Sequence, residues 1–87
     1  MYAADPTTRE FRRFLIGPRG CEITGVDLTP DYKTMFVNIQ HPGESPSERS
    51  DPANPTAISS WPDGSKHNRP RSATIAIWRE DGKEVGT

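Results

Sequence analysis

The alternation of apolar and polar residues is clearest in Thr34–Gln40, near the middle of the chain. Successive residues of a strand point to opposite faces, so Met35, Val37 and Ile39 share one face. Phe36 places an apolar side chain on the other face. The pattern therefore predicts a strand that is covered on both sides.

A second segment, Glu22–Leu28, precedes this strand and is joined to it by the polar turn Thr29–Lys33. Pro30 presets φ for the first corner of a turn, and Asp31 can accept hydrogen bonds from the local backbone. The two segments are therefore expected to form a hairpin. Turns of this shape often need a left-handed residue near Tyr32, where a residue other than glycine costs on the order of 1 kcal/mol.

A later segment, Ala73–Arg79, is rich in β-branched residues and ends at Asp81-Gly82. Asp-Gly between extended segments is a strong short-range hairpin signal. A short return strand is therefore expected at Lys83–Gly86, which would be an edge unless another segment pairs with it.

The N-terminal segment permits two interpretations. Thr7–Glu10 matches a capping box, and apolar residues follow it at helical spacing, which favours a helix. Alternatively, Tyr2–Ala4 and Glu10–Ile16 flank a turn at Asp5–Arg9 and form a hairpin. We favour the hairpin, because strand–turn–strand units suit the rest of the chain.

Residues 41–72 are expected to form one long loop, since they hold six prolines and seven serines. Proline cannot donate to a sheet ladder and disfavours helix before it. The fold class is therefore all-β: a small antiparallel sheet with a long Pro/Ser-rich loop, in a single small domain over residues 1–87.

Composition limits what such a domain can do alone. The chain has 87 residues, of which 31% are hydrophobic, with 9 prolines and 7 glycines, so its stability should be marginal. The net charge of −1 gives no electrostatic reason to expect nucleic acid as a partner. No apolar stretch approaches the ~20 residues of a membrane span. The N-terminus lacks the pattern of a signal peptide, so any export signal is expected outside this chain.

Five stretches of the chain form a recognisable series: Arg13–Gly25, Leu28–Asp31, Met35–Glu44, Ser60–Gly64 and Arg69–Thr74. The most specific part is Phe36–Glu44. In their order and spacing, these stretches resemble the C-terminal end of the PhoX family of alkaline phosphatases.

The resemblance implies a β-propeller, whose blades are four-stranded antiparallel sheets around a central channel. This chain would supply roughly one blade, with the remaining blades of the parent chain as its partners. The resemblance also implies hydrolysis of small phosphate esters with calcium and iron, and twin-arginine export to the periplasm or the extracellular space. So short a chain cannot close a propeller, and it is expected to be inactive alone. The alternative is a non-catalytic binding or structural β module that uses loop 41–72 as an interaction surface.

Glu22 is the first candidate site residue. The resemblance places it in a Gly-x-Glu-x-x-Gly segment of the family, where the glutamate is a metal ligand. Carboxylate oxygens are the hard ligands that calcium and ferric iron favour. The competing interpretation is an exposed glutamate at a strand end.

Arg19 and His41 are the candidate phosphate-binding residues. A guanidinium group matches phosphate oxygens bidentately. The sequence departs here from better-known members of the family, whose arginine lies nearer the glutamate, where Gly20 stands. His41 can act as general acid, metal ligand or phosphate donor near neutral pH. Alternatively, Arg19 is a solvated side chain and His41 bonds the turn that ends its strand. The single cysteine, Cys21, is expected to be a small buried apolar residue.

Overall fold

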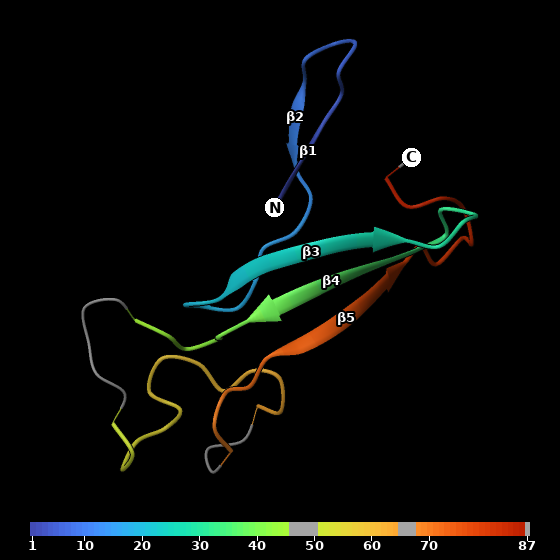
Figure 1. Ribbon diagram of the computed structural model, residues 1–87. Coiled ribbons are helices and arrows are strands. Elements are labelled where there is room, and N and C mark those ends of the chain that lie inside the picture. Colours follow the sequence, from blue (N-terminus) through green and yellow to red (C-terminus); the bar gives the residue numbers. More distant parts are fainter. Residues whose placement is uncertain (46–50, 65–67, 87) are drawn as a thin grey trace.

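A computed structural model describes residues 1–45, 51–64 and 68–86. These residues hold five strands and no helix, so none of their segments could cross a membrane as a helix (Figure 1). The predicted all-β class is therefore confirmed. The strands are β1 (Tyr2–Ala4), β2 (Phe11–Arg13), β3 (Glu22–Leu28), β4 (Thr34–Gln40) and β5 (Ala73–Trp78).

The main sheet is antiparallel and has the order β3-β4-β5, so β4 is its central strand. Ile39 faces Ile23 on one side and Ala73 on the other, which places apolar side chains together on one face. Val37 is 0% exposed and Ile39 is 2% exposed, and no other apolar side chain of the described residues is buried as fully. The core is therefore a thin layer on one face of β4.

The opposite face of the sheet is open among the described residues. Phe36 is 41% exposed and Trp78 is 67% exposed. Between β4 and β5, the Thr74 hydroxyl donates to Asn38 Oδ1 at 2.7 Å. The expectation that β4 is covered on both faces is therefore not met among the described residues, because Phe36 is exposed on this face.

The turn between β3 and β4 has the chemistry that its sequence predicts. The Thr29 hydroxyl donates to Asp31 Oδ1 at 2.7 Å, and the Lys33 amide donates to the same oxygen at 3.1 Å. These bonds, the Thr29 hydroxyl foremost, lower the pKa of Asp31. Tyr32 has φ 58°, so the left-handed residue falls at the expected position.

The chain does not return beside β5, so the return strand predicted at Lys83–Gly86 is wrong. The Asp-Gly turn itself forms, with the Gly82 amide donating to the Arg79 carbonyl at 3.1 Å. Beyond it, the Val85 amide donates to the Tyr32 carbonyl at 2.8 Å. This bond ties the segment to the β3–β4 turn and thereby directs it away from the β5 edge.

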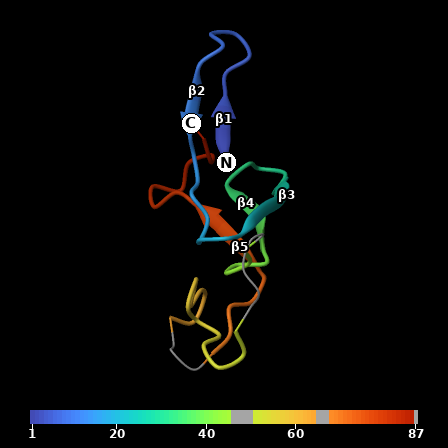
Figure 2. The same cartoon turned by 90° about the vertical axis from the view of Figure 1, so that its left-hand side faces the viewer.

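The N-terminal segment is a hairpin, as favoured, and not a helix. β1 and β2 pair antiparallel, with Tyr2 opposite Arg13. Asp5 Oδ1 accepts hydrogen bonds from the Thr7 amide at 2.8 Å and from the Thr8 amide at 3.2 Å. Thr7 and Thr8, which belong to the capping-box pattern, therefore lie in the turn of the hairpin and not at the start of a helix. Figures 1 and 2 show this hairpin projecting away from the main sheet.

The described parts of the predicted loop, residues 41–45, 51–64 and 68–72, contain neither strand nor helix. Residues 46–50 and 65–67 of that loop lie outside the described residues. Ile58 and Trp61 are half-buried, and the Arg71 amide donates to the Trp61 carbonyl at 3.3 Å. The loop therefore bends back toward the start of β5.

Replacing Tyr32 with glycine should stabilise the hairpin, because glycine adopts a left-handed φ without the Cβ clash that tyrosine suffers. The expected gain in the free energy of unfolding of the β3–β4 unit is on the order of 1 kcal/mol. Amide hydrogen exchange, resolved by peptide, measures it as slower exchange of β3 and β4. Lys33→Gly is the matched control, since it adds only freedom to the unfolded chain and should speed exchange. Faster exchange in Tyr32→Gly would contradict the prediction.

The turn after β5 should lose a stabilising ion pair only in strong acid. Arg79 Nη2 lies 2.7 Å from Asp81 Oδ2, and this contact is the main cause that lowers the pKa of Asp81 to about 2. A depressed folded-state pKa contributes stability that is present above the usual pKa of 3.8 and lost as pH falls through about 2. Carbon-13 NMR of the Asp81 carboxyl should therefore show a midpoint near 2, and Arg79→Gln should move that midpoint up toward the usual value.

Candidate functional site

One end of the main sheet brings two loops together. The Gly43 amide donates to the Arg19 carbonyl at 2.8 Å, and the Glu44 amide donates to the His41 carbonyl at 3.1 Å. Glu22 is opposite Gln40 in the sheet register, directly beside this turn. Arg19, Glu22 and His41, the three site residues that the sequence predicts, therefore lie at the same end of the sheet.

Close contact between these loops requires glycine at position 20. Gly20 has φ 77°, and a Cβ there would lie 2.9 Å from the Glu44 backbone nitrogen and nearer still to the Glu44 carbonyl oxygen. Real Cβ atoms essentially never approach backbone this closely. The packing of this chain therefore requires a residue without a Cβ at position 20.

Glu22 begins β3 and is exposed. Its carboxylate has no hydrogen bond or ion pair to any described residue, so both oxygens are available to bind a cation. Calcium takes six to eight oxygen ligands. No group of three or more His, Cys, Asp or Glu within the described ranges could hold a metal ion. Glu22 therefore suits one coordination position, and the described residues do not fit a complete metal centre.

His41 is exposed and adopts φ 52° at the end of β4. Its amide donates to Ser72 Oγ at 3.1 Å, which links the end of β4 to the start of β5. The Gln40 side-chain amide nitrogen lies 3.0 Å from His41 Nε2. An amide NH₂ group acts only as a hydrogen-bond donor, so Gln40 donates to Nε2. In the neutral ring the proton is then on Nδ1, which leaves Nδ1 able to donate to a bound oxyanion.

Arg19 is exposed, and its side chain has no partner among the described residues. Its backbone carbonyl holds the turn through Gly43 while its guanidinium group is available. Cys21, between Arg19 and Glu22, is half-buried rather than fully buried. Its sulfur packs against Gly17, where a Cβ would overlap it.

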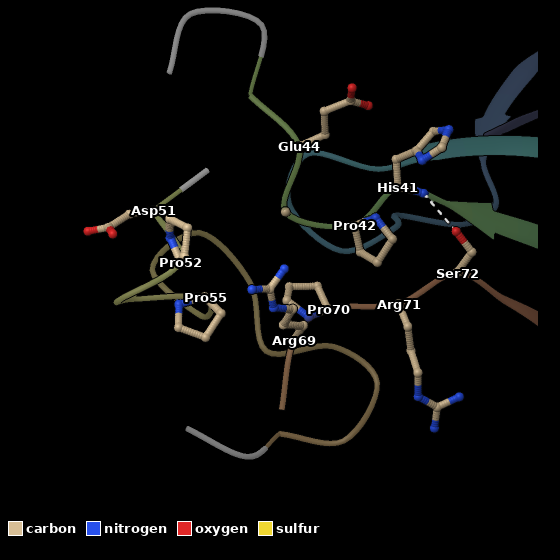
Figure 3. A pocket seen from close by; sticks show the side chains of 11 residues that line it. His41, Pro42, Glu44, Asp51, Pro52, Pro55, Arg69, Pro70, Arg71 and Ser72 are labelled. Carbon is tan, nitrogen blue, oxygen red and sulfur yellow. Dashed lines mark hydrogen bonds between the residues drawn. The ribbon is translucent and has the colours of Figure 1, made fainter. Parts of the chain in front are cut away.

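A cleft of about 510 Å³ opens beside the His41–Glu44 turn (Figure 3). Four prolines, two carboxylates and three basic residues contribute to its lining. Arg71 is held by Asp63, with Nε donating to Oδ2 at 3.2 Å and Nη2 donating to Oδ1 at 2.9 Å. The Arg71 hydrogen bond lowers the pKa of Asp63.

The cleft is not evident from the sequence pattern, in which the two arginines before β5 have no assigned role. The available signal was the string Arg69-Pro70-Arg71, which ends the long loop where β5 begins. The prolines restrict the backbone on both sides of the cleft. The cleft extends the candidate site from the predicted residues toward the loop.

Replacing Gly20 with alanine should separate the two loops. Gly64→Ala is a matched control, because Gly64 has a similar φ of 68° but nothing within 4 Å of the position that a Cβ would take. Both variants should lose about 1–2 kcal/mol from left-handed strain. Only Gly20→Ala should also speed amide exchange at Gly43, measured by peptide-resolved mass spectrometry. Equal effects of the two variants at Gly43 would show that the contact is not needed.

Comparison with known proteins supports the resemblance to the PhoX family that the sequence indicates. A family model described as "Alkaline phosphatase PhoX" matches residues 1–43. A solved structure of Pseudomonas fluorescens PhoX, in complex with the transition-state analogue vanadate, matches with a TM-score of 0.79 and 47% sequence identity. The match covers 98% of this chain and 13% of that chain. None of the curated proteins compared with the chain matches it.

The match to the solved structure extends over both sheets and the intervening loop, because it leaves only 2% of this chain uncovered. The sheet therefore corresponds to a region of the PhoX β-propeller, which confirms the predicted resemblance to a propeller blade. The chain spans 13% of the length of the solved chain that it matches. This chain therefore belongs to the PhoX family of alkaline phosphatases.

Proposed function

We propose that this segment is the C-terminal part of a phosphatase that hydrolyses small phosphate esters, and that it supplies site residues without being catalytic alone. The observation that carries the proposal is the 47% identity to a PhoX in complex with vanadate. Vanadate is an analogue of the phosphoryl group in transfer, so the matched protein supports phosphate-ester chemistry in this family.

Glu22 is the proposed metal ligand, and Arg19 and His41 are the proposed phosphate-binding residues. Their common position at one end of the sheet supports a shared site. Phosphoryl transfer develops negative charge on the phosphate oxygens, and preorganised cations and donors stabilise that charge. The Arg19 guanidinium and the His41 ring are available as donors for that charge, because neither is engaged by an acidic side chain among the described residues.

Calcium and iron are the proposed cofactors, with their remaining ligands supplied by parts of the parent outside this chain. The proposed location is the periplasm or the extracellular space, reached by twin-arginine export. The family resemblance supports both proposals. The free carboxylate of Glu22 is compatible with either metal, since both favour oxygen ligands.

The remaining propeller blades are the proposed partners of residues 1–87, which act as one β unit of the parent. The open face with Phe36 and Trp78 supports this proposal, because exposed apolar side chains on a sheet mark a surface that another layer covers. The outer edge of β5 supports it too, since none of the described strands pairs there.

Glu22→Gln in the full-length protein tests the metal role. We expect phosphatase kcat/KM to fall about 100-fold or more, together with loss of bound metal measured by elemental mass spectrometry, because removing the charge weakens a hard-cation ligand. Glu10→Gln is the control, as Glu10 is on the N-terminal hairpin and pairs with Arg12 at 3.1 Å. It should leave both quantities unchanged.

Two results would contradict the proposal in different ways. Unchanged activity and metal content in Glu22→Gln would leave Glu22 as an exposed strand-end residue. A folded, metal-loaded full-length protein without phosphatase activity would instead favour the binding or structural module.

A further inference from the structure

Arg69 and Arg71 line the same cleft but differ in their surroundings. Arg71 is held by two hydrogen bonds to Asp63, whereas the Arg69 side chain has no hydrogen bond or ion pair to any described residue. Figure 3 shows the Arg71 side chain directed away from the cleft and the Arg69 guanidinium directed toward its middle. Arg69 is therefore the cationic group that the cleft itself presents.

The acidic residues of the cleft do not neutralise Arg69. Figure 3 shows the carboxylates of Glu44 and Asp51 pointing outward, away from the Arg69 guanidinium. Neither carboxylate forms an ion pair with Arg69. An anion that enters the cleft therefore meets a guanidinium whose donors are all free of protein partners within the described residues.

Proline rings form the apolar part of the cleft lining, and charged and polar residues supply the rest. Each proline has a fixed φ, which restricts the backbone at these positions. A restricted backbone lowers the entropic cost of binding. The cleft volume of about 510 Å³ is in the range of small-ligand pockets. The prolines are Pro42, Pro52, Pro55 and Pro70.

We propose that Arg69 binds the phosphate group of an organic phosphate ester in this cleft, with the organic group packed against the proline rings. The inference rests on the proposed function and adds to it a recognition residue and a substrate subsite. A guanidinium group can donate two parallel hydrogen bonds to phosphate oxygens, which lysine cannot reproduce. The cleft adjoins His41, so a bound phosphate lies at the same end of the sheet as the other candidate residues.

The test uses the full-length protein and inorganic phosphate as the probe. Isothermal titration calorimetry should show phosphate affinity reduced about tenfold or more in Arg69→Gln, since a charge-assisted bidentate contact is lost. Arg69→Lys should recover only part of that affinity. Arg12→Gln is the control, because Arg12 is paired with Glu10 on the separate hairpin, and it should bind phosphate as the unaltered protein does.

A second measurement needs no variant. Phenylglyoxal modifies accessible arginines, and mass spectrometry locates the modified residues. Phosphate should protect Arg69 and leave the modification of Arg12 unchanged.

Each contrary outcome overturns the inference. Equal phosphate affinity in Arg69→Gln and Arg12→Gln, with no protection of Arg69, would show that Arg69 does not bind the anion. Phosphatase activity toward p-nitrophenyl phosphate is measured in parallel. If the protein is active but phosphate affinity is unchanged in Arg69→Gln, only this inference is rejected. If Arg69 binds phosphate but the protein is inactive, only the proposed function is rejected.

Discussion

The position of β4 between two antiparallel neighbours is the constraint on which the rest of the structure depends. It is paired along both edges, and its Val37 and Ile39 side chains form the fully buried part of the apolar layer. Its last residue is opposite Glu22, and the chain turns immediately afterwards at His41. The same strand therefore provides the core and sets the location of the candidate site.

The sheet was largely predictable from sequence, because its determinants are local. Alternation specified β4 with the bounds that the structure has, and Pro30 and Asp31 specified the turn that joins β3 to it. The missing return strand was not predictable in this way. The path of residues 83–86 depends on the Val85–Tyr32 hydrogen bond. This bond joins residues far apart in the chain, so no local sequence pattern predicts it.

The candidate site was predictable residue by residue but not as an arrangement. Glu22 and His41 were identified by their chemistry and by the resemblance, and the sheet register places them together. The approach of the Arg19 loop to the His41 turn depends instead on the close contact of Gly20 with Glu44. In the sequence, Gly20 stands out only as a position that lacks an arginine. The structure gives a steric reason for glycine at this position. Arg69 and Arg71 are two positions apart and chemically identical, so only the pairing of Arg71 with Asp63 separates them.

The long connection between β4 and β5 has a consequence for how this segment can diverge among relatives. The free energy cost of closing a flexible loop grows slowly with length, by about 0.6 kcal/mol for each doubling. Insertions and deletions in residues 41–72 should therefore be tolerated while the pairing of Ile39 with Ala73 persists. Because the cleft is built largely from this connection, its shape can change between relatives at little cost to the sheet, and the anion site proposed there would change with it.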